Sequence, residues 1–234
     1  MIVEQQPIIS ALQTIHARIK NACAKVGRSE NEVRLLLATK TVSSEKIKIA
    51  VNAGETLIGE NHVQEYKEKF EAIKDLPCER HFIGHLQTNK IKDVLKYVSC
   101  IQSVDSIDLA EKLDARLRYE SKNIDIYVQI NTSFEESKFG IEPDKAFDLI
   151  QRINQLETLK IKGLMTIGLL SEDALLVKKS YRLLRELRDE AIAKGLLHAD
   201  CKELSMGMSH DLELAIEEGA TMVRVGSAIF GKRV

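Results

Sequence analysis

Short apolar runs rich in β-branched residues alternate along the chain with longer stretches of helical periodicity. We predict strands at residues 33–40, 56–60, 80–84, 100–104, 124–131, 160–167, 203–206 and 222–225. Strands that are separated by helices predict parallel βαβ units with right-handed crossovers. Eight such units favour an α/β fold, a closed (β/α)8 barrel of the TIM type, with an open doubly wound sheet as the alternative.

One additional helix is predicted before the first strand. Ile8, Leu12, Ile15 and Ile19 follow the spacing of an amphipathic helix, and Gly27 can end it. The chain has 234 residues, which fits one domain, because such barrels run to about 200–250 residues. We therefore expect residues 1–234 to form a single barrel domain with an extra N-terminal helix.

Composition narrows the class of protein and its compartment. Lys plus Arg number 34 and Asp plus Glu 35, a balance that argues against nonspecific nucleic-acid binding. No apolar run approaches the roughly 20 residues that span a bilayer, and the N-terminus lacks the pattern of a secretory signal. The four cysteines are scattered without a CxxC pair, which is typical of reduced thiols in a cytoplasmic protein.

Lys40 is the first candidate for chemistry. The active site of a (β/α)8 barrel lies at the C-terminal ends of the strands, and Lys40 ends the first predicted strand. Burial lowers the pKa of a lysine, and the neutral amine forms a Schiff base with an aldehyde. The alternative is a lysine that leaves the sheet and extends its ammonium into water.

Arg224 and two serine-bearing loops indicate a ligand at the same end of the barrel. Arg224 lies inside the eighth apolar strand, where it serves either in a structural salt bridge or as a donor to a ligand. Ser209 follows the seventh strand, and Gly226 with Ser227 follows the eighth. These two loops are the recurrent phosphate site of such barrels, although a serine before a helix can also be a simple N-cap.

Two other short patterns resemble a helix cap and a metal site. Asn61 with Gln64 predicts the capped start of the helix after the second strand. The spacing Cys78-x2-His81-x3-His85 resembles a set of metal ligands. Residues four apart on a strand lie about 13 Å from each other, too far to share one zinc ion, and no fourth ligand is evident. We therefore expect no metal site.

Seven short segments occur in an order that is specific to one family. They are LLATKT at 36–41, GENHVQE at 59–65, HFIGHLQTNK at 81–90, SKFG at 137–140, GLM at 163–165, LSMGMS at 204–209 and VRVGSAIFG at 223–231. With them the chain resembles the YggS/PROSC-type pyridoxal phosphate homeostasis proteins from end to end.

The resemblance implies a barrel similar to the N-terminal domain of alanine racemase, with pyridoxal 5′-phosphate (PLP) at its mouth. It implies a Schiff base on Lys40, Arg224 against the pyridine nitrogen, and Asn61 beside the cofactor ring. Ser209, Gly226 and Ser227 would surround the phosphate; Ser227 stands where many relatives have threonine, which keeps the hydroxyl. The resemblance leaves the role of residues 81–90 unassigned.

An arginine at the ring nitrogen favours a carrier over a catalyst. PLP catalysis relies on the ring as an electron sink, and an arginine cannot keep the nitrogen protonated as a carboxylate does. A racemase also needs a second base, which alanine racemases take from a further domain and a dimer, whereas this chain ends at Val234. We therefore expect a monomeric PLP homeostasis protein rather than an enzyme.

Such a protein would bind PLP, limit free aldehyde and could supply apo PLP-dependent enzymes. Two other functions stay open on the residues. One is a small PLP-dependent amino-acid racemase, which activity towards amino acids would reveal. The other is a Schiff-base aldolase-type barrel without PLP, which a cofactor chromophore on the purified protein would exclude.

Overall fold

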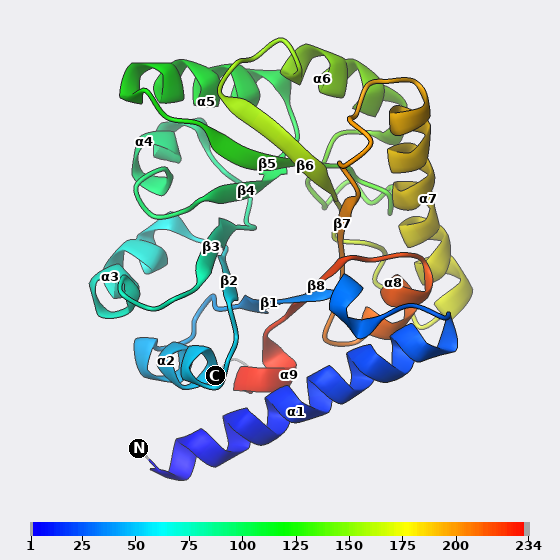
Figure 1. Ribbon diagram of the computed structural model, residues 1–234. Helices are drawn as coiled ribbons and strands as arrows, with labels where there is room; N and C mark the ends of the chain where they lie inside the picture. The colour runs from blue at the N-terminus through cyan, green and yellow to red at the C-terminus, as the bar shows by residue number, and fades with distance from the viewer. Residues whose placement is uncertain (1, 232–234) are drawn as a thin grey trace.

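A ring of eight parallel strands forms the centre of the molecule (Figure 1). The computed structural model describes residues 2–231, with side chains from residue 5 onwards. Within that range the strands pair in chain order, and β1 pairs with β8 to close the barrel. The strands are β1 (Arg34–Ala38), β2 (Leu57–Glu60), β3 (Glu79–Phe82), β4 (Cys100–Val104), β5 (Ile124–Gln129), β6 (Leu159–Met165), β7 (Glu203–Met208) and β8 (Met222–Val225).

Helices surround the barrel, as the right-handed crossovers of parallel strands require (Figure 1). They are α1 (Ile2–Lys25), α2 (Ser44–Asn52), α3 (Val63–Ile73), α4 (Ile91–Val94), α5 (Ile107–Glu120), α6 (Ala146–Ile153), α7 (Ala174–Ala193), α8 (Leu212–Glu217) and α9 (Ser227–Phe230). Three short 3-10 turns lie at Glu30–Glu32, Thr88–Lys90 and Pro143–Lys145. The closed barrel confirms the predicted fold class and removes the open sheet as an alternative.

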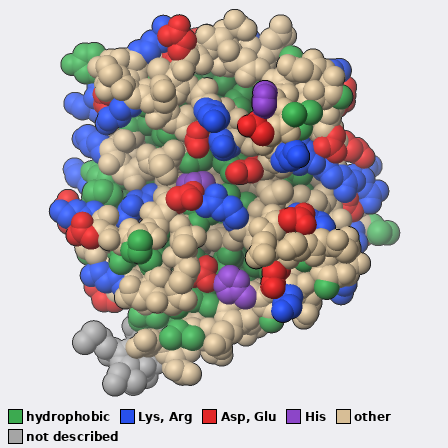
Figure 2. Space-filling model, viewed as in Figure 1, with side chains coloured by type: hydrophobic (Ala, Val, Ile, Leu, Met, Phe, Trp, Pro, Cys, Tyr) green, Lys and Arg blue, Asp and Glu red, His purple; other side chains and the backbone are tan. Residues whose placement is uncertain are grey.

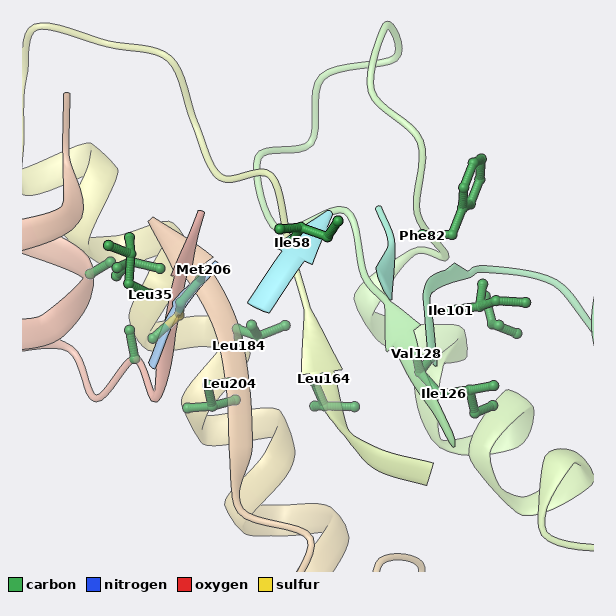
Figure 3. Close-up of a cluster of buried hydrophobic side chains, with 14 of the residues drawn as sticks. Leu35, Ile58, Phe82, Ile101, Ile126, Val128, Leu164, Leu184, Leu204 and Met206 are labelled. Atoms are coloured by element: carbon green, nitrogen blue, oxygen red, sulfur yellow. The ribbon is translucent and has the colours of Figure 1, made fainter. Parts of the chain in front are cut away.

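Most strand residues are buried on both faces of the sheet, because each face packs against a different layer. The outward side chains pack against the helices, and Figure 3 shows part of this layer, including Leu35, Ile126 and Leu204 of the strands with Leu184 of α7. The inward side chains form a separate small cluster inside the barrel: Leu36, Leu57, Cys100, Tyr127, Met165 and Met222. This packed interior closes the barrel below its mouth.

The predicted N-terminal helix is present as α1 and lies along the outside of the barrel. It packs against α2, α8 and α9 (Figure 1). Its apolar face, which includes Ile8, Leu12, Ile15 and Ile19, is almost fully buried, so it contributes to the main core. Among residues 2–231, no helix combines the length and the apolar character that crossing a bilayer would require.

Most predicted strand boundaries differ from the observed ones by one or two residues. The shift that matters for the site concerns the first strand, which ends at Ala38, so that Lys40 lies in the loop beyond it. On the face shown in Figure 2, basic and acidic side chains are mixed, in line with the near-zero net charge of the chain, −1.

Candidate functional site

One cavity of about 680 Å³ lies where the carboxyl ends of the strands meet the loops. All six residues singled out from the sequence line it: Lys40, Asn61, Ser209, Arg224, Gly226 and Ser227. They come from the ends of β1, β2, β7 and β8, so the closed ring brings together positions almost 190 residues apart in sequence. Lys46 adds a further amine, and none of the described lining residues is Asp or Glu. The cavity is therefore suited to an anion.

The loop that carries Lys40 has a constrained backbone. Thr41 has φ of 60°, the left-handed region, which a β-branched residue adopts only when its surroundings enforce it. Its N–H donates to Glu65 Oε2 of α3 at 2.9 Å. The Lys69 ammonium, also on α3, donates to the carbonyl of Thr39 at 2.8 Å and of Val42 at 3.3 Å. Helix α3 thus holds the loop on both sides of Lys40, which is itself half-buried.

A buried carboxylate anchors Lys69 behind this loop. Glu60, at the end of β2, is fully buried and accepts from Thr39 Oγ1 at 2.5 Å and from Lys69 Nζ at 2.7 Å. Burial raises the pKa of Glu60 above its usual range, and the nearby Lys69 ammonium acts in the opposite direction. The pair lies on the helix side of the strands, so it supports the site without lining it.

Arg224 is buried at the floor of the cavity, with 6% of its surface exposed. Its Nη1 donates to the carbonyl of Ser205 at 2.7 Å and to the Ser205 hydroxyl at 2.8 Å, and Nη2 donates to the carbonyl of Thr166 at 2.7 Å. None of these acceptors is a carboxylate, so the alternative of a structural salt bridge is wrong. Burial lowers the pKa of Arg224, but a guanidinium remains charged and can only donate.

The two serine-bearing loops meet on one side of the cavity. Ser227 Oγ donates to Ser209 Oγ at 3.3 Å, so both hydroxyls lie together. Helix α8 begins at Leu212 after Asp211, and the alternative of Ser209 as its N-cap is therefore wrong. Gly226 lies close to β1: a Cβ there would stand 2.9 Å from the Ala38 carbonyl oxygen. The absence of a side chain lets this backbone reach the cavity wall.

Helix α1 supports the loop that carries Ser209. Arg18 Nη1 donates to the Ser209 carbonyl at 3.0 Å, and the same guanidinium makes two hydrogen bonds to Glu213 of α8, at 2.6 and 2.8 Å. The extra N-terminal helix therefore contacts the site through one arginine. The amphipathic pattern of α1 predicted the helix but gave no sign of this contact, because Arg18 lies on its polar side.

Asn61 presents an acceptor that has no partner among the residues that the structure describes. Its Oδ1 is buried without a hydrogen bond, which is costly unless something else satisfies it. The prediction that Asn61 caps a helix is wrong, because α3 begins at Val63 after His62 with no side-chain cap. Gly84 packs against the Asn61 backbone, where a Cβ would lie 2.1 Å from the carbonyl oxygen. The Asn61 side chain is thus positioned by close packing and left available to a ligand.

The histidines of the metal-like spacing have different surroundings. His81 lies in the barrel interior, where its Nδ1 is 2.7 Å from Gln102 Nε2. His85 stacks on Phe139 with ring centroids 3.8 Å apart. Within residues 2–231, no three His, Cys, Asp or Glu side chains are grouped so as to hold a metal ion.

Residues 11–234 match the family model for the N-terminal domain of alanine racemase. The chain belongs to this family. Within it, the chain is 44% identical to the pyridoxal phosphate homeostasis protein of Aquifex aeolicus over 222 residues, which cover 95% of this chain and 96% of that protein. This relative confirms the resemblance to the pyridoxal phosphate homeostasis proteins.

Two solved structures are also similar to this member of the family. A crystal structure of an unknown protein from Bifidobacterium adolescentis has a TM-score of 0.92 at 40% identity, covering 97% of this chain and 96% of that one. PipY from Synechococcus elongatus, solved with PLP bound, has a TM-score of 0.83 at 30% identity, covering 96% of this chain and all of that one.

Several lining residues were not singled out from the sequence. Ser43 and Lys46 belong to the start of α2, and Met165, Met208 and Phe230 supply apolar surface. A signal for Lys46 exists, since it follows Lys40 closely and lies in the first turn of the next helix. The apolar residues give no such signal, because they are indistinguishable in sequence from core residues.

Proposed function

We propose that this chain binds PLP in the cavity, with Lys40 as the residue that carries it through a Schiff base, and serves PLP homeostasis as one PLP-binding domain. The observation that carries the proposal is the convergence of Lys40, Arg224 and the Ser209–Ser227 hydroxyl pair on a single cavity whose described lining has no carboxylate. The homeostasis name of its curated relatives and the PLP-bound structure of PipY support it.

The described residues fit the cofactor. PLP combines an anionic phosphate, an aldehyde and an aromatic ring with a nitrogen acceptor. Ser209, Ser227 and the backbone at Gly226 would hold the phosphate, because small residues and hydroxyls leave donors open to an anion. Arg224 would donate to the ring nitrogen, and the unpartnered Oδ1 of Asn61 would accept from the ring substituents.

Arg224 would affect the reactivity of the bound cofactor through its ring nitrogen. PLP supplies an electron sink whose strength depends on protonation of its ring nitrogen. Arg224 holds its own protons and cannot transfer one to that nitrogen, and no described lining residue is an acid. The site would therefore hold the cofactor while giving it a weak electron sink, which suits storage and supply rather than turnover.

Absorption spectra of wild type and Lys40→Ala with added PLP, before and after borohydride reduction, test the proposal. We expect a yellow wild type, loss of the visible band in Lys40→Ala, and a pyridoxyl group on the Lys40 peptide by mass spectrometry. Lys48→Ala, a lysine of α2 that does not line the cavity, is the matched control and should keep the band. A reduced group confined to Lys46 or to other lysines contradicts the assignment of Lys40.

The proposal includes the absence of an enzymatic role, supply of PLP to apo enzymes, a monomer and a cytoplasmic location. Mixing the PLP-loaded protein with an apo PLP-dependent enzyme, in the presence of a scavenger of free PLP, tests supply directly. Recovery of activity faster than with equimolar free PLP supports it. An amino-acid racemase assay on the same preparation tests the alternative, and turnover that disappears in Lys40→Ala would favour a racemase.

A further inference from the structure

A chain of buried hydrogen bonds crosses the barrel interior below the cavity. It begins at Arg224 Nη1, which donates to Ser205 Oγ at 2.8 Å. Ser205 Oγ donates to Gln102 Oε1 at 2.6 Å, and Gln102 Nε2 lies 2.7 Å from His81 Nδ1. The chain therefore runs from β8 through β7 to β4 and β3, across the closed ring. Ser205 and Gln102 are fully buried and His81 is 4% exposed, so water does not replace these bonds.

With the Gln102 amide oxygen facing Ser205 and its nitrogen facing His81, the donor and acceptor capacities of the four groups set the direction of every bond. The guanidinium of Arg224 can only donate, so Ser205 Oγ accepts from it and gives its single hydrogen to Gln102 Oε1. The amide nitrogen of Gln102 then faces His81 Nδ1 and the sulfur of Met222, which is 3.1 Å away. Nδ1 must therefore be the unprotonated nitrogen of His81. The hydrogen of the neutral ring lies on Nε2, which is 3.5 Å from Glu79 Oε2.

The surroundings of His81 favour this neutral form. Burial is the largest influence and lowers the pKa of His81, while the Glu79 carboxylate on the same strand raises it. The other charged groups that act on His81 are Arg34 on β1, which lowers its pKa, and Asp125 on β5, which raises it. A protonated His81 would carry hydrogen on both nitrogens and would meet the Gln102 amide as donor against donor.

We propose that His81, Gln102 and Ser205 are positioning residues that orient the Arg224 guanidinium towards the ring of the bound cofactor; this rests on the proposed PLP function. Among the described residues, the Ser205 hydroxyl is the only side-chain acceptor of Arg224, whose other acceptors are backbone carbonyls. When His81 is protonated, the Gln102 amide must turn its oxygen to His81 and its nitrogen to Ser205. Ser205 then loses the acceptor of its hydrogen, and the orientation of Arg224 changes. The direction of these hydrogen bonds thus has a functional consequence at the mouth of the barrel.

The first test compares two buried serines. Ser205→Ala removes the link to Arg224, whereas Ser103→Ala removes a hydroxyl on β4 that is equally buried and makes no hydrogen bond to any described residue. We expect Ser205→Ala to weaken PLP binding on the order of tenfold, as for loss of a hydrogen bond to a charged group, and to shift the visible band. Ser103→Ala should bind PLP as wild type does. Equal affinities and spectra for the two variants would overturn the positioning role.

The second test reads His81 without the cofactor. Imidazole ¹⁵N NMR of the wild-type apoprotein should show an unprotonated Nδ1 at neutral pH. Gln102→Glu places an acceptor where the amide donates, so we expect it to shift His81 to the doubly protonated form at the same pH, with a changed pH dependence of the PLP band. A wild-type hydrogen on Nδ1, or an unchanged His81 in Gln102→Glu, would overturn the inference.

The two tests separate this inference from the proposed function. A wild type without a pyridoxyl group on Lys40 after reduction refutes the Schiff base proposed there, while the NMR measurement still decides the direction of the hydrogen bonds between Arg224 and His81. Normal PLP binding with an unaltered spectrum in Ser205→Ala refutes the positioning role and leaves the PLP proposal intact. Urea unfolding of each variant shows whether a loss of PLP binding comes from an unstable fold rather than from a misplaced Arg224 guanidinium.

Discussion

The Lys69 ammonium lies 2.7 Å from the Glu60 carboxylate, directly behind the loop that carries Lys40. The side chain of Lys69 is 11% exposed and that of Glu60 is fully buried, so water screens this pair little. Because Lys69 also donates to the carbonyls of Thr39 and Val42, one ion pair links β2, α3 and the Lys40 loop. The position of Lys40 therefore depends on two residues that do not line the cavity.

We expect Lys69→Met to destabilise the fold strongly, because methionine fills a similar volume but leaves Glu60 as a buried charge without its cation. Removing one partner of a buried pair costs about 3–5 kcal/mol, which urea unfolding measures. The double variant Lys69→Met/Glu60→Gln, in which the carboxylate is also neutral, should recover much of the loss. A loss below about 1 kcal/mol in the single variant would mean that the pair behaves like an exposed one.

The same carboxylate predicts a pH dependence of stability. Burial raises the folded-state pKa of Glu60, so between the unfolded value of about 4.3 and the raised folded value the native state binds more protons than the unfolded state. The free energy of unfolding then falls as pH rises through this window. Urea unfolding at a series of pH values from acid to neutral measures this effect. We expect the free energy of unfolding of the wild type to fall relative to that of Glu60→Gln as the pH rises. Parallel curves would contradict the raised pKa.

The parts of the site that could be predicted from the sequence are those marked by a break in an apolar strand. Lys40 and Arg224 are polar residues in or beside such runs, and the loops after the last two strands carry Ser209 and Ser227, so both position and chemistry were visible. The predicted cap at Asn61 and the alternative of a cap at Ser209 were wrong, because α3 and α8 begin after His62 and Asp211. Local capping preferences are too weak to locate a helix start that loop packing decides.

The residues that the sequence did not reveal act through tertiary contacts. Lys69, Arg18 and Ser205 reach the site from elements that are distant in sequence, and nothing in their neighbourhood along the chain indicates the partner. Gln102 and Ser205 did carry a signal, since each is a polar residue inside a buried strand and must have a partner. Only the closed barrel, which sets β4 opposite β8, shows that these two residues belong to one series of hydrogen bonds from Arg224 to His81.

Close packing at Gly84 predicts a steric effect that is separate from backbone strain. A Cβ at Gly84 would lie 2.1 Å from the Asn61 carbonyl oxygen, so we expect Gly84→Ala to cost about 1–3 kcal/mol, as overpacking does, and to weaken PLP binding by displacing Asn61. Gly195→Ala is the control: its φ is 69°, and a Cβ there would meet no described atom within 4 Å beyond its chain neighbours. It should therefore cost about 1–2 kcal/mol through strain alone and leave PLP binding unchanged. Unaltered PLP binding in a folded Gly84→Ala variant would contradict a contact between Asn61 and the cofactor.

The paired hydroxyls predict a loss of affinity that depends on the phosphate. Ser209 and Ser227 lie 3.3 Å apart at the cavity wall, and each is expected to donate to the phosphate of PLP. Ser209→Ala and Ser227→Ala should each weaken PLP binding about tenfold, because a hydrogen bond to a charged group contributes about 1.5–3 kcal/mol, partly replaced by water at the exposed Ser227. Neither change should alter the weak binding of pyridoxal, which has the same ring and aldehyde without the phosphate. Titration of each variant with both compounds, followed in the visible band, measures both affinities. Only a contact to the phosphate discriminates between the two ligands. An equal loss of affinity for PLP and pyridoxal would therefore place the hydroxyls near the ring.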